Sequence, residues 1–223
     1  MTPASSRRAY ARQMTPADLV GSATARQPVP MVPEISLLTA VPSVELWDLW
    51  QRTGRDEPPF WAYPWAGGQA LARYLLDHPD VVRGRRVLDV ASGSGLVAIA
   101  AARAGAARVV AGDIDPHAVE AITVNATANA VTVEARLFDL AADDPADAAV
   151  ILAGDVFYQR ELAQLALRFA RAAADGGADV LLADPGRAFL PADSLTPVAL
   201  YDVPVLTAIE NAPVKTVTIY RLR

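Results

Sequence analysis

A short acidic and glycine-rich segment offers the clearest chemistry in the chain. Asp89 lies within the apolar run VLDVA (87–91), and Gly93 and Gly95 follow it closely. Glycine permits turn conformations closed to other residues and lets a ligand approach the backbone. Ligands of open α/β sheets bind at the carboxyl ends of strands, where the strand order reverses. We therefore expect a ligand at this turn, in contact with Ala91, Gly93 and Gly95.

Three interpretations of this turn compete: a tight turn without a ligand, a dinucleotide site and a methyltransferase site. Gly93, Gly95 and Ala98 match the GxGxxA pattern of dinucleotide sites. Asp89, however, precedes the first glycine by four residues, where its carboxylate would repel a pyrophosphate and attract a cation. S-adenosylmethionine carries an ammonium and a sulfonium group, so the sequence favours this cofactor and a methyltransferase.

A second acidic residue is suited to a ribose. Asp113 directly follows the apolar segment 108–112, and a carboxylate at such a strand end can accept hydrogen bonds from ribose hydroxyls. NAD sites use the same contact, so Asp113 does not distinguish the two cofactors. Helix capping is its alternative role, although Asp115 before Pro116 already supplies a cap.

Four more residues could surround the rest of the cofactor. Asp139, just past segment 131–137, is placed to accept from the adenine amino group or, alternatively, to form a turn. Ile114 and Leu140 could line the adenine pocket. Trp65 could stack on the sulfonium or the adenine by cation–π attraction, although large aromatic residues more often pack in cores.

The candidate catalytic pair is Asp155 and Tyr158, which follow the apolar segment 149–153. This segment is expected beside the first strand, so both side chains would face the transferred methyl group. A lysine, with a pKa of about 10.4, must lose a proton before it attacks. Asp155 would hold its ammonium and Tyr158 would orient the lone pair, so catalysis would be mostly positioning. The alternative is a capped helix start with a core tyrosine; DPGR (184–187) is either part of the site or a turn.

The elements that must position these residues alternate between strands and helices, which specifies a doubly wound α/β domain. We predict a Rossmann-like seven-stranded sheet, mostly parallel, with a C-terminal antiparallel hairpin and an N-terminal helical segment. The predicted strands are 87–91, 108–112, 131–137, 149–153, 179–183, 197–205 and 213–221, and the predicted helices are 42–51, 67–77, 96–104, 160–174 and one that begins at Pro116.

The N-terminal part of the chain differs in composition from the rest. Residues 1–33 are rich in Pro, Ser and Arg, which predicts a flexible N-terminal arm. Residues 34–223 would form a single methyltransferase domain, with 34–84 as an N-terminal helical cap and 85–223 as the Rossmann-like core.

Composition argues against several classes of site. The chain has 223 residues, a formal net charge of −5 and no cysteine, which disfavours bulk nucleic-acid binding and excludes disulfides and thiolate metal sites. No apolar run is long enough to span a bilayer, and no cluster of residues has metal-ligand spacing. We expect a cytoplasmic protein without a metal ion or a membrane partner. Its alanine and arginine usage is typical of a GC-rich bacterial genome.

With these residues in hand, the chain resembles the seven-β-strand methyltransferases of family 16 from about Pro33 to Arg187. Ala66 departs from the pattern, because the family usually has proline after the tryptophan, and the resemblance fades beyond Pro191. The WAGGQAL and DPGR segments are the most specific. The matching segments are PEI (33–35), WAGGQALARYLLDHPDVVRG (65–84), VLDVASGSG (87–95), GDIDP (112–116), AITVN (121–125), GDVFY (154–158) and ADPGR (183–187).

The resemblance implies a monomeric enzyme with Asp89 and Gly93 at the methionine end of the cofactor, Asp113 at its ribose, and Asp155 to Tyr158 at the acceptor. It also implies methylation of a protein lysine, with the β subunit of electron transfer flavoprotein as the favoured acceptor. Methylation of a small nicotinamide-like amine, methylation of a ribosomal protein, and cofactor binding without turnover remain alternatives.

Overall fold

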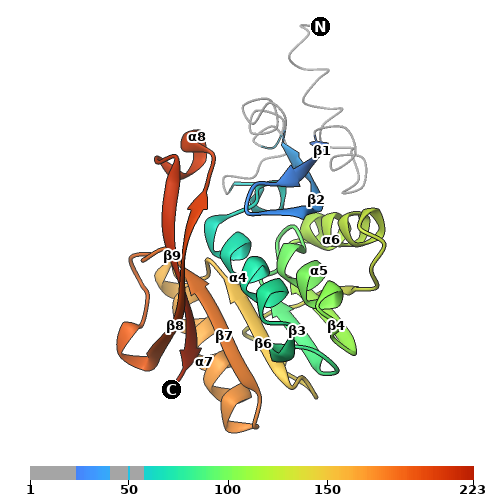
Figure 1. Cartoon of the computed structure of the whole chain (residues 1–223). Coiled ribbons are helices and arrows are strands. Elements are labelled where there is room, and N and C mark those ends of the chain that lie inside the picture. The colour runs from blue at the N-terminus through green and yellow to red at the C-terminus, as the bar shows by residue number, and fades with distance from the viewer. Residues whose placement is uncertain (1–23, 41–49, 51–57) are drawn as a thin grey trace, which may run out of the picture.

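The apolar strands of the chain assemble into one seven-stranded sheet (Figure 1), in a computed structural model that describes residues 24–40, 50 and 58–223. The first five strands in spatial order are parallel neighbours, and the last two are antiparallel. The predicted doubly wound sheet with a C-terminal antiparallel hairpin is thus confirmed. In spatial order the strands are β5 (Glu134–Leu137), β4 (Arg108–Asp113), β3 (Arg86–Val90), β6 (Val150–Gly154), β7 (Asp179–Asp184), β9 (Val214–Leu222) and β8 (Leu195–Pro204).

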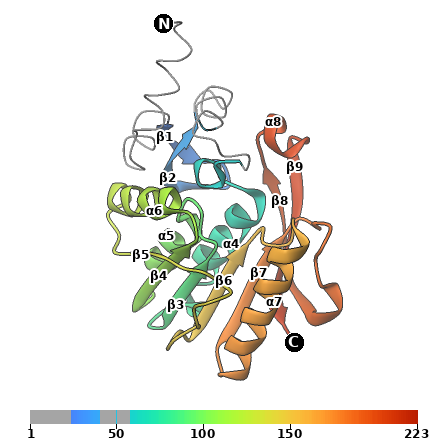
Figure 2. The same ribbon diagram turned by 180° about the vertical axis from the view of Figure 1, so that it is seen from behind.

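Helices cover both faces of this sheet, as the views from opposite sides in Figures 1 and 2 show. On β6, Val150 and Leu152 belong to the core under α4, α5 and α6, whereas Ile151 and Ala153 pack on the α7 side. Continuous apolar strands are typical of parallel sheets that are buried on both faces. The helices are α4 (Ala66–Asp77), α5 (Leu96–Arg103), α6 (Pro116–Ala128), α7 (Arg160–Asp175) and the short α8 (Thr207–Glu210), with 3-10 turns η1 (Phe60–Ala62), η2 (Pro79–Val81) and η3 (Ala192–Ser194).

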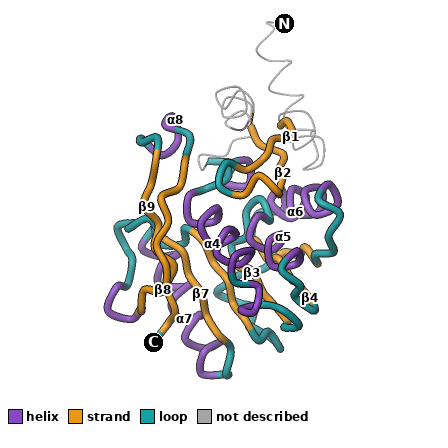
Figure 3. Tube along the Cα trace, in the orientation of Figure 1, coloured by secondary structure: helices purple, strands orange, loops and turns teal. Residues whose placement is uncertain are grey.

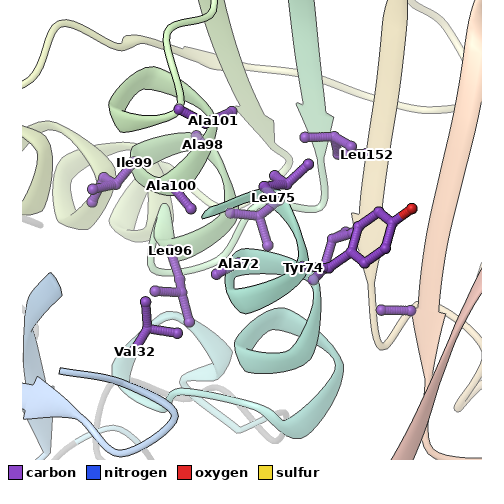
Figure 4. Packing of buried hydrophobic residues seen from close by; sticks show 14 of the residues in the cluster. Val32, Ala72, Tyr74, Leu75, Leu96, Ala98, Ile99, Ala100, Ala101 and Leu152 are labelled. Atoms are coloured by element: carbon purple, nitrogen blue, oxygen red, sulfur yellow. The ribbon is translucent and has the colours of Figure 1, made fainter. Parts of the chain in front are cut away.

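Helix α4, which begins at the candidate site, packs closely on α5, and this packing fixes its position. Ala72 and Leu75 of α4 and Leu96 and Ala100 of α5 are fully or almost fully buried, and Figure 4 shows these side chains together in one cluster. Alanines let the two helix backbones approach closely, and such dense interiors resist displacement. Ala66 and Ala70, near the start of α4, are fully buried as well, so this packing holds the beginning of α4 against the core.

The structure corrects the prediction for residues 24–40, which were expected to belong to a flexible arm (1–33) and to a helical cap (34–84). Residues 24–40 form an antiparallel ribbon of β1 (Thr24–Val29) and β2 (Val32–Ala40). Asn125 and Asn129 of α6 hold the β2 backbone, for example through Leu38 N to Asn125 Oδ1 at 2.8 Å and Asn129 Nδ2 to Ser36 O at 2.7 Å. The proline-rich composition obscured these strand contacts. Residues 1–23 and most of the predicted helix 42–51 lie outside the described residues.

The C-terminal hairpin extends beyond the end of the sheet, as Figure 3 shows, with α8 at its tip. The tip lies at the same end of the sheet as the start of α4. Within the described part of the chain, no helix is long and apolar enough to cross a membrane. The fold thus brings the hairpin tip and the N-terminus of α4 to the end of the sheet where the parallel strands finish.

Candidate active site

A cavity of about 750 Å³ lies at the carboxyl ends of β3, β4 and β6. β3 pairs with both β4 and β6 in parallel, so the strand order reverses between β3 and β6, and ligands of open α/β sheets bind there. The cavity has a size typical of small-molecule sites. Of the residues predicted for the cofactor and the reaction, those that line it are Trp65, Asp89, Ala91, Gly93, Asp113, Ile114, Asp155 and Tyr158.

Asp89 is the central carboxylate at the cofactor end. It is 1% exposed and accepts from Ser92 Oγ at 2.5 Å and from the Ala98 backbone N–H at 3.1 Å. Burial raises its pKa to about 7. Ala91 and Gly93 both have positive φ, 50° and 56°, so the chain turns sharply just after this strand. A buried carboxylate with neutral donors would gain from a cationic ligand in the cavity.

Asp113 fixes the glycine turn from the neighbouring strand. Its Oδ2 accepts from the Gly93 N–H at 2.8 Å, and its Oδ1 accepts from the Asp115 N–H at 3.0 Å. Burial raises the pKa of Asp113. Asp115 itself caps α6 before Pro116, as predicted. Asp113 thus both shapes the turn and presents a carboxylate to the cavity, and the adjacent Ile114 is 70% exposed at its edge.

Aromatic side chains form one wall of the cavity. The ring of Phe60 lies 5.6 Å from that of Trp65 and 5.2 Å from that of Tyr158. Trp65 Nε1 donates to the Phe60 carbonyl at 2.8 Å, which fixes the indole. Phe60, the first residue of η1, was not predicted for the site, because it belongs to no recognisable motif. The wall offers apolar surface and π faces to a cation.

Asp155 lines the cavity just past β6 in a strained conformation, with φ of 58°. Its Oδ2 accepts from the backbone N–H groups of Gly67 at 2.5 Å and Gly68 at 3.2 Å, at the first turn of α4. A Cβ on Gly67 would lie only 2.5 Å from that oxygen. The absence of a side chain at Gly67 therefore lets α4 begin against this carboxylate.

The DPGR turn contributes a residue that the sequence left undecided between site and turn. Arg187 lines the cavity and donates from Nη2 to Asp155 Oδ1 at 2.8 Å. Asp184 organises the turn, since its Oδ1 accepts from the Gly186 and Arg187 N–H groups at 2.7 and 2.6 Å. Burial raises the pKa of Asp155, and the Arg187 guanidinium opposes that rise.

Three predicted cofactor residues lie outside the lining of the cavity: Gly95, Asp139 and Leu140. Gly95, with φ of 83°, begins α5 and faces α6, where an added Cβ would lie 3.2 Å from Ile122 Cα. Asp139 accepts from the Ala141 N–H at 2.8 Å, as a turn aspartate does. The contact of Gly95 with the cofactor and the roles of Asp139 and Leu140 in binding adenine stay predictions.

The residues present suit S-adenosylmethionine. The buried Asp89 carboxylate complements a cation, Asp113 lies at the strand end where ribose is expected, and the aromatic wall complements a sulfonium. When bound, this cofactor supplies an electrophilic methyl group. Asp89 and Asp113 would hold its methionine and ribose portions, and Trp65 and Tyr158 would border the methyl group.

Comparisons with known proteins agree with this geometry. The family model described as ribosomal protein L11 methyltransferase (PrmA) matches residues 69–180. The chain is 39% identical over 188 residues to the electron transfer flavoprotein beta subunit lysine methyltransferase of Xenopus laevis, covering 82% of this chain and 76% of that protein. The Homo sapiens protein of the same name is 38% identical over 200 residues, covering 85% and 75%.

The fold is also similar to solved structures. The magnesium protoporphyrin IX methyltransferase of Synechocystis PCC 6803 with bound SAH matches with a TM-score of 0.51 at 15% identity, over 70% of this chain and 82% of that one. This likeness concerns the fold alone, whereas the sequence relatives concern the family. The chain therefore belongs to the family of S-adenosylmethionine-dependent methyltransferases that includes the electron transfer flavoprotein β-subunit lysine methyltransferases.

Proposed function

We propose that this protein transfers a methyl group from S-adenosylmethionine to a lysine side chain of another protein, and that the β subunit of electron transfer flavoprotein is the acceptor. The observation that carries this proposal is the extent of the similarity. The alignments with the two named lysine methyltransferases cover 82% and 85% of the chain. The match to the ribosomal-protein methyltransferase model is shorter and spans residues 69–180. The similarity thus reaches beyond the part that binds the cofactor.

The geometry of the cavity supports amine methylation. An acceptor amine must be neutral to attack, although lysine has an ordinary pKa of about 10.4. Tyr158 and Asp155 border the acceptor side of the cavity, where a phenol and a carboxylate can orient an amine by hydrogen bonds. The wall of Phe60 and Trp65 keeps water from the methyl group. Most of the rate enhancement would come from alignment of the amine with the methyl group.

In the direct test, the purified protein is mixed with S-adenosylmethionine and the electron transfer flavoprotein of the same organism. The intact mass of the β subunit is then measured. We expect one or more methyl increments. Tyr158→Phe should lower kcat by about a hundredfold with the cofactor Kd unchanged. Cofactor binding without any mass shift would contradict this acceptor and direct the test to ribosomal proteins and nicotinamide-like amines.

We further propose that the protein is monomeric and cytoplasmic. The absence of cysteine is compatible with a reducing compartment, and the family resemblance implies a monomer. Light scattering coupled to size-exclusion chromatography would test the first statement, and cell fractionation would test the second.

A further inference from the structure

Three charged residues from distant parts of the chain meet at the acceptor side of the cavity. Asp155 follows β6, Arg187 lies in the turn after β7, and Glu210 ends α8 at the tip of the C-terminal hairpin. Arg187 Nη2 lies 2.8 Å from Asp155 Oδ1 and 3.0 Å from Glu210 Oε1. One guanidinium is therefore shared between two carboxylates, both of which are buried.

The Asp155 carboxylate has no capacity left for a further strong donor. Oδ2 accepts from the Gly67 and Gly68 N–H groups, and Oδ1 accepts from Arg187 Nη2 at 2.8 Å and Nε at 3.3 Å. A carboxylate has about four lone-pair sites. A lysine ammonium can reach Asp155 only if one donor leaves. The two backbone groups are fixed by the packing of α4, so Arg187 is the donor that can move.

Glu210 provides a second position for the guanidinium. It is 5% exposed, and in the described part of the structure its carboxylate receives its hydrogen bonds from Arg187, through Nη2 at 3.0 Å and Nη1 at 3.3 Å. This two-point contact would hold Arg187 after it releases Asp155, so no buried charge is left unpaired. Asp184 lies beside the group as a third acid, and burial raises its pKa to about 6. The acids outnumber the guanidinium, which favours entry of a second cation.

We propose that Arg187 is a movable placeholder for the acceptor ammonium. In the free enzyme its guanidinium binds the Asp155 carboxylate. When the lysine side chain enters, the guanidinium moves onto Glu210 and the lysine ammonium binds Asp155 in its place. This inference rests on the proposed function, because it concerns the amine acceptor of that reaction. It makes the hairpin tip part of the acceptor site. An acceptor without a cationic amine cannot displace Arg187, so the exchange also selects the substrate class. Arg187 and Glu210 act as positioning residues.

The test uses butylammonium, which reproduces the lysine side chain without its backbone, titrated by calorimetry into the complex of the full chain with S-adenosylhomocysteine. Glu210→Gln removes the negative charge that would hold the displaced guanidinium and should weaken butylammonium binding about tenfold. Arg187→Gln/Glu210→Gln removes the placeholder together with its partner and should restore binding to within about twofold of wild type. The affinity for uncharged 1-butanol should not differ in this way among the wild type, Glu210→Gln and the double variant.

Asp202→Asn is the matched control, because Asp202 is a carboxylate of the same hairpin that accepts from Thr216 Oγ1 at 2.7 Å, away from the cavity. It should leave butylammonium binding unchanged. A double variant as weak as Glu210→Gln, or a Glu210→Gln variant as tight as wild type, would overturn the placeholder. Thermal unfolding of each variant verifies folding. Failure of the wild type to methylate electron transfer flavoprotein would instead contradict the proposed acceptor, since the order of butylammonium affinities does not depend on it.

Discussion

The two ends of the cavity are built in different ways. At the cofactor end, Asp89, Gly93 and Asp113 lie within one strand–helix–strand unit, and their hydrogen bonds join residues close in sequence. At the acceptor end, Asp155 is joined to Gly67, which is 88 residues away, and to Arg187, which is 32 residues away. On the proposed function, the cofactor would be bound by a local unit, whereas the acceptor would be bound by residues assembled from across the fold.

This difference predicts that changes at the two ends affect different steps. Asp89→Asn should lower the affinity for S-adenosylmethionine about a hundredfold, because a buried carboxylate loses its charge opposite a cation. Asp155→Asn should leave that affinity within about threefold and instead abolish most methyl transfer. Calorimetry with the cofactor and intact-mass assays separate the two effects. Equal loss of cofactor affinity in both variants would contradict the division of the site.

Gly67→Ala tests how tightly the acceptor end is assembled. Its Cβ would lie 2.5 Å from Asp155 Oδ2 and 2.7 Å from the Ala183 carbonyl oxygen, so we expect a loss of about 1–3 kcal/mol in the free energy of unfolding. Gly68→Ala is the matched control, since the nearest atoms to its Cβ lie at 4.0 Å. Chemical denaturation measures both. Equal stability of the two variants would show that α4 can shift away from Asp155.

Cofactor affinity should depend on pH through Asp89, whose pKa burial raises to about 7. A cation prefers the ionised carboxylate, so affinity should rise with pH up to about 7 and then level off, with a loss of about tenfold per pH unit below that value. The stability of the free protein should move the opposite way: the folded state binds this proton more tightly than the unfolded chain, so stability falls as pH rises from about 4 to about 7. In Asp89→Asn the pH dependence of cofactor affinity should flatten, and that of stability should become less steep, since burial also raises the pKa values of Asp113, Asp155 and Asp184. An unchanged slope of affinity would assign that dependence to another group.

Asp139→Ala should have the smallest effect. If Asp139 only closes the turn through the Ala141 N–H, cofactor affinity changes by less than about twofold and stability falls by about 1 kcal/mol. If Asp139 binds the adenine amino group, as predicted from the sequence, cofactor affinity falls about tenfold. Competition between S-adenosylmethionine and its inosine analogue, which lacks the amino group, distinguishes the two roles.

The parallel sheet, the position of the cofactor turn and the acids beside it could all be predicted from local sequence patterns. Strand periodicity, the two glycines and Asp89 depend on neighbours within a few residues, and such local constraints are visible in a linear pattern. The C-terminal hairpin was also readable, because no helical pattern separates its two strands.

The three-dimensional structure was needed to see how the acceptor end is assembled. It turned part of the expected arm into a ribbon held by Asn125 and Asn129, and it showed Asp155 engaged by the first turn of α4. It also brought Glu210 from the hairpin tip to Arg187. Contacts of this kind join residues far apart in the chain, and their hydrogen bonds depend on the packing of whole elements, which no local pattern of residues encodes.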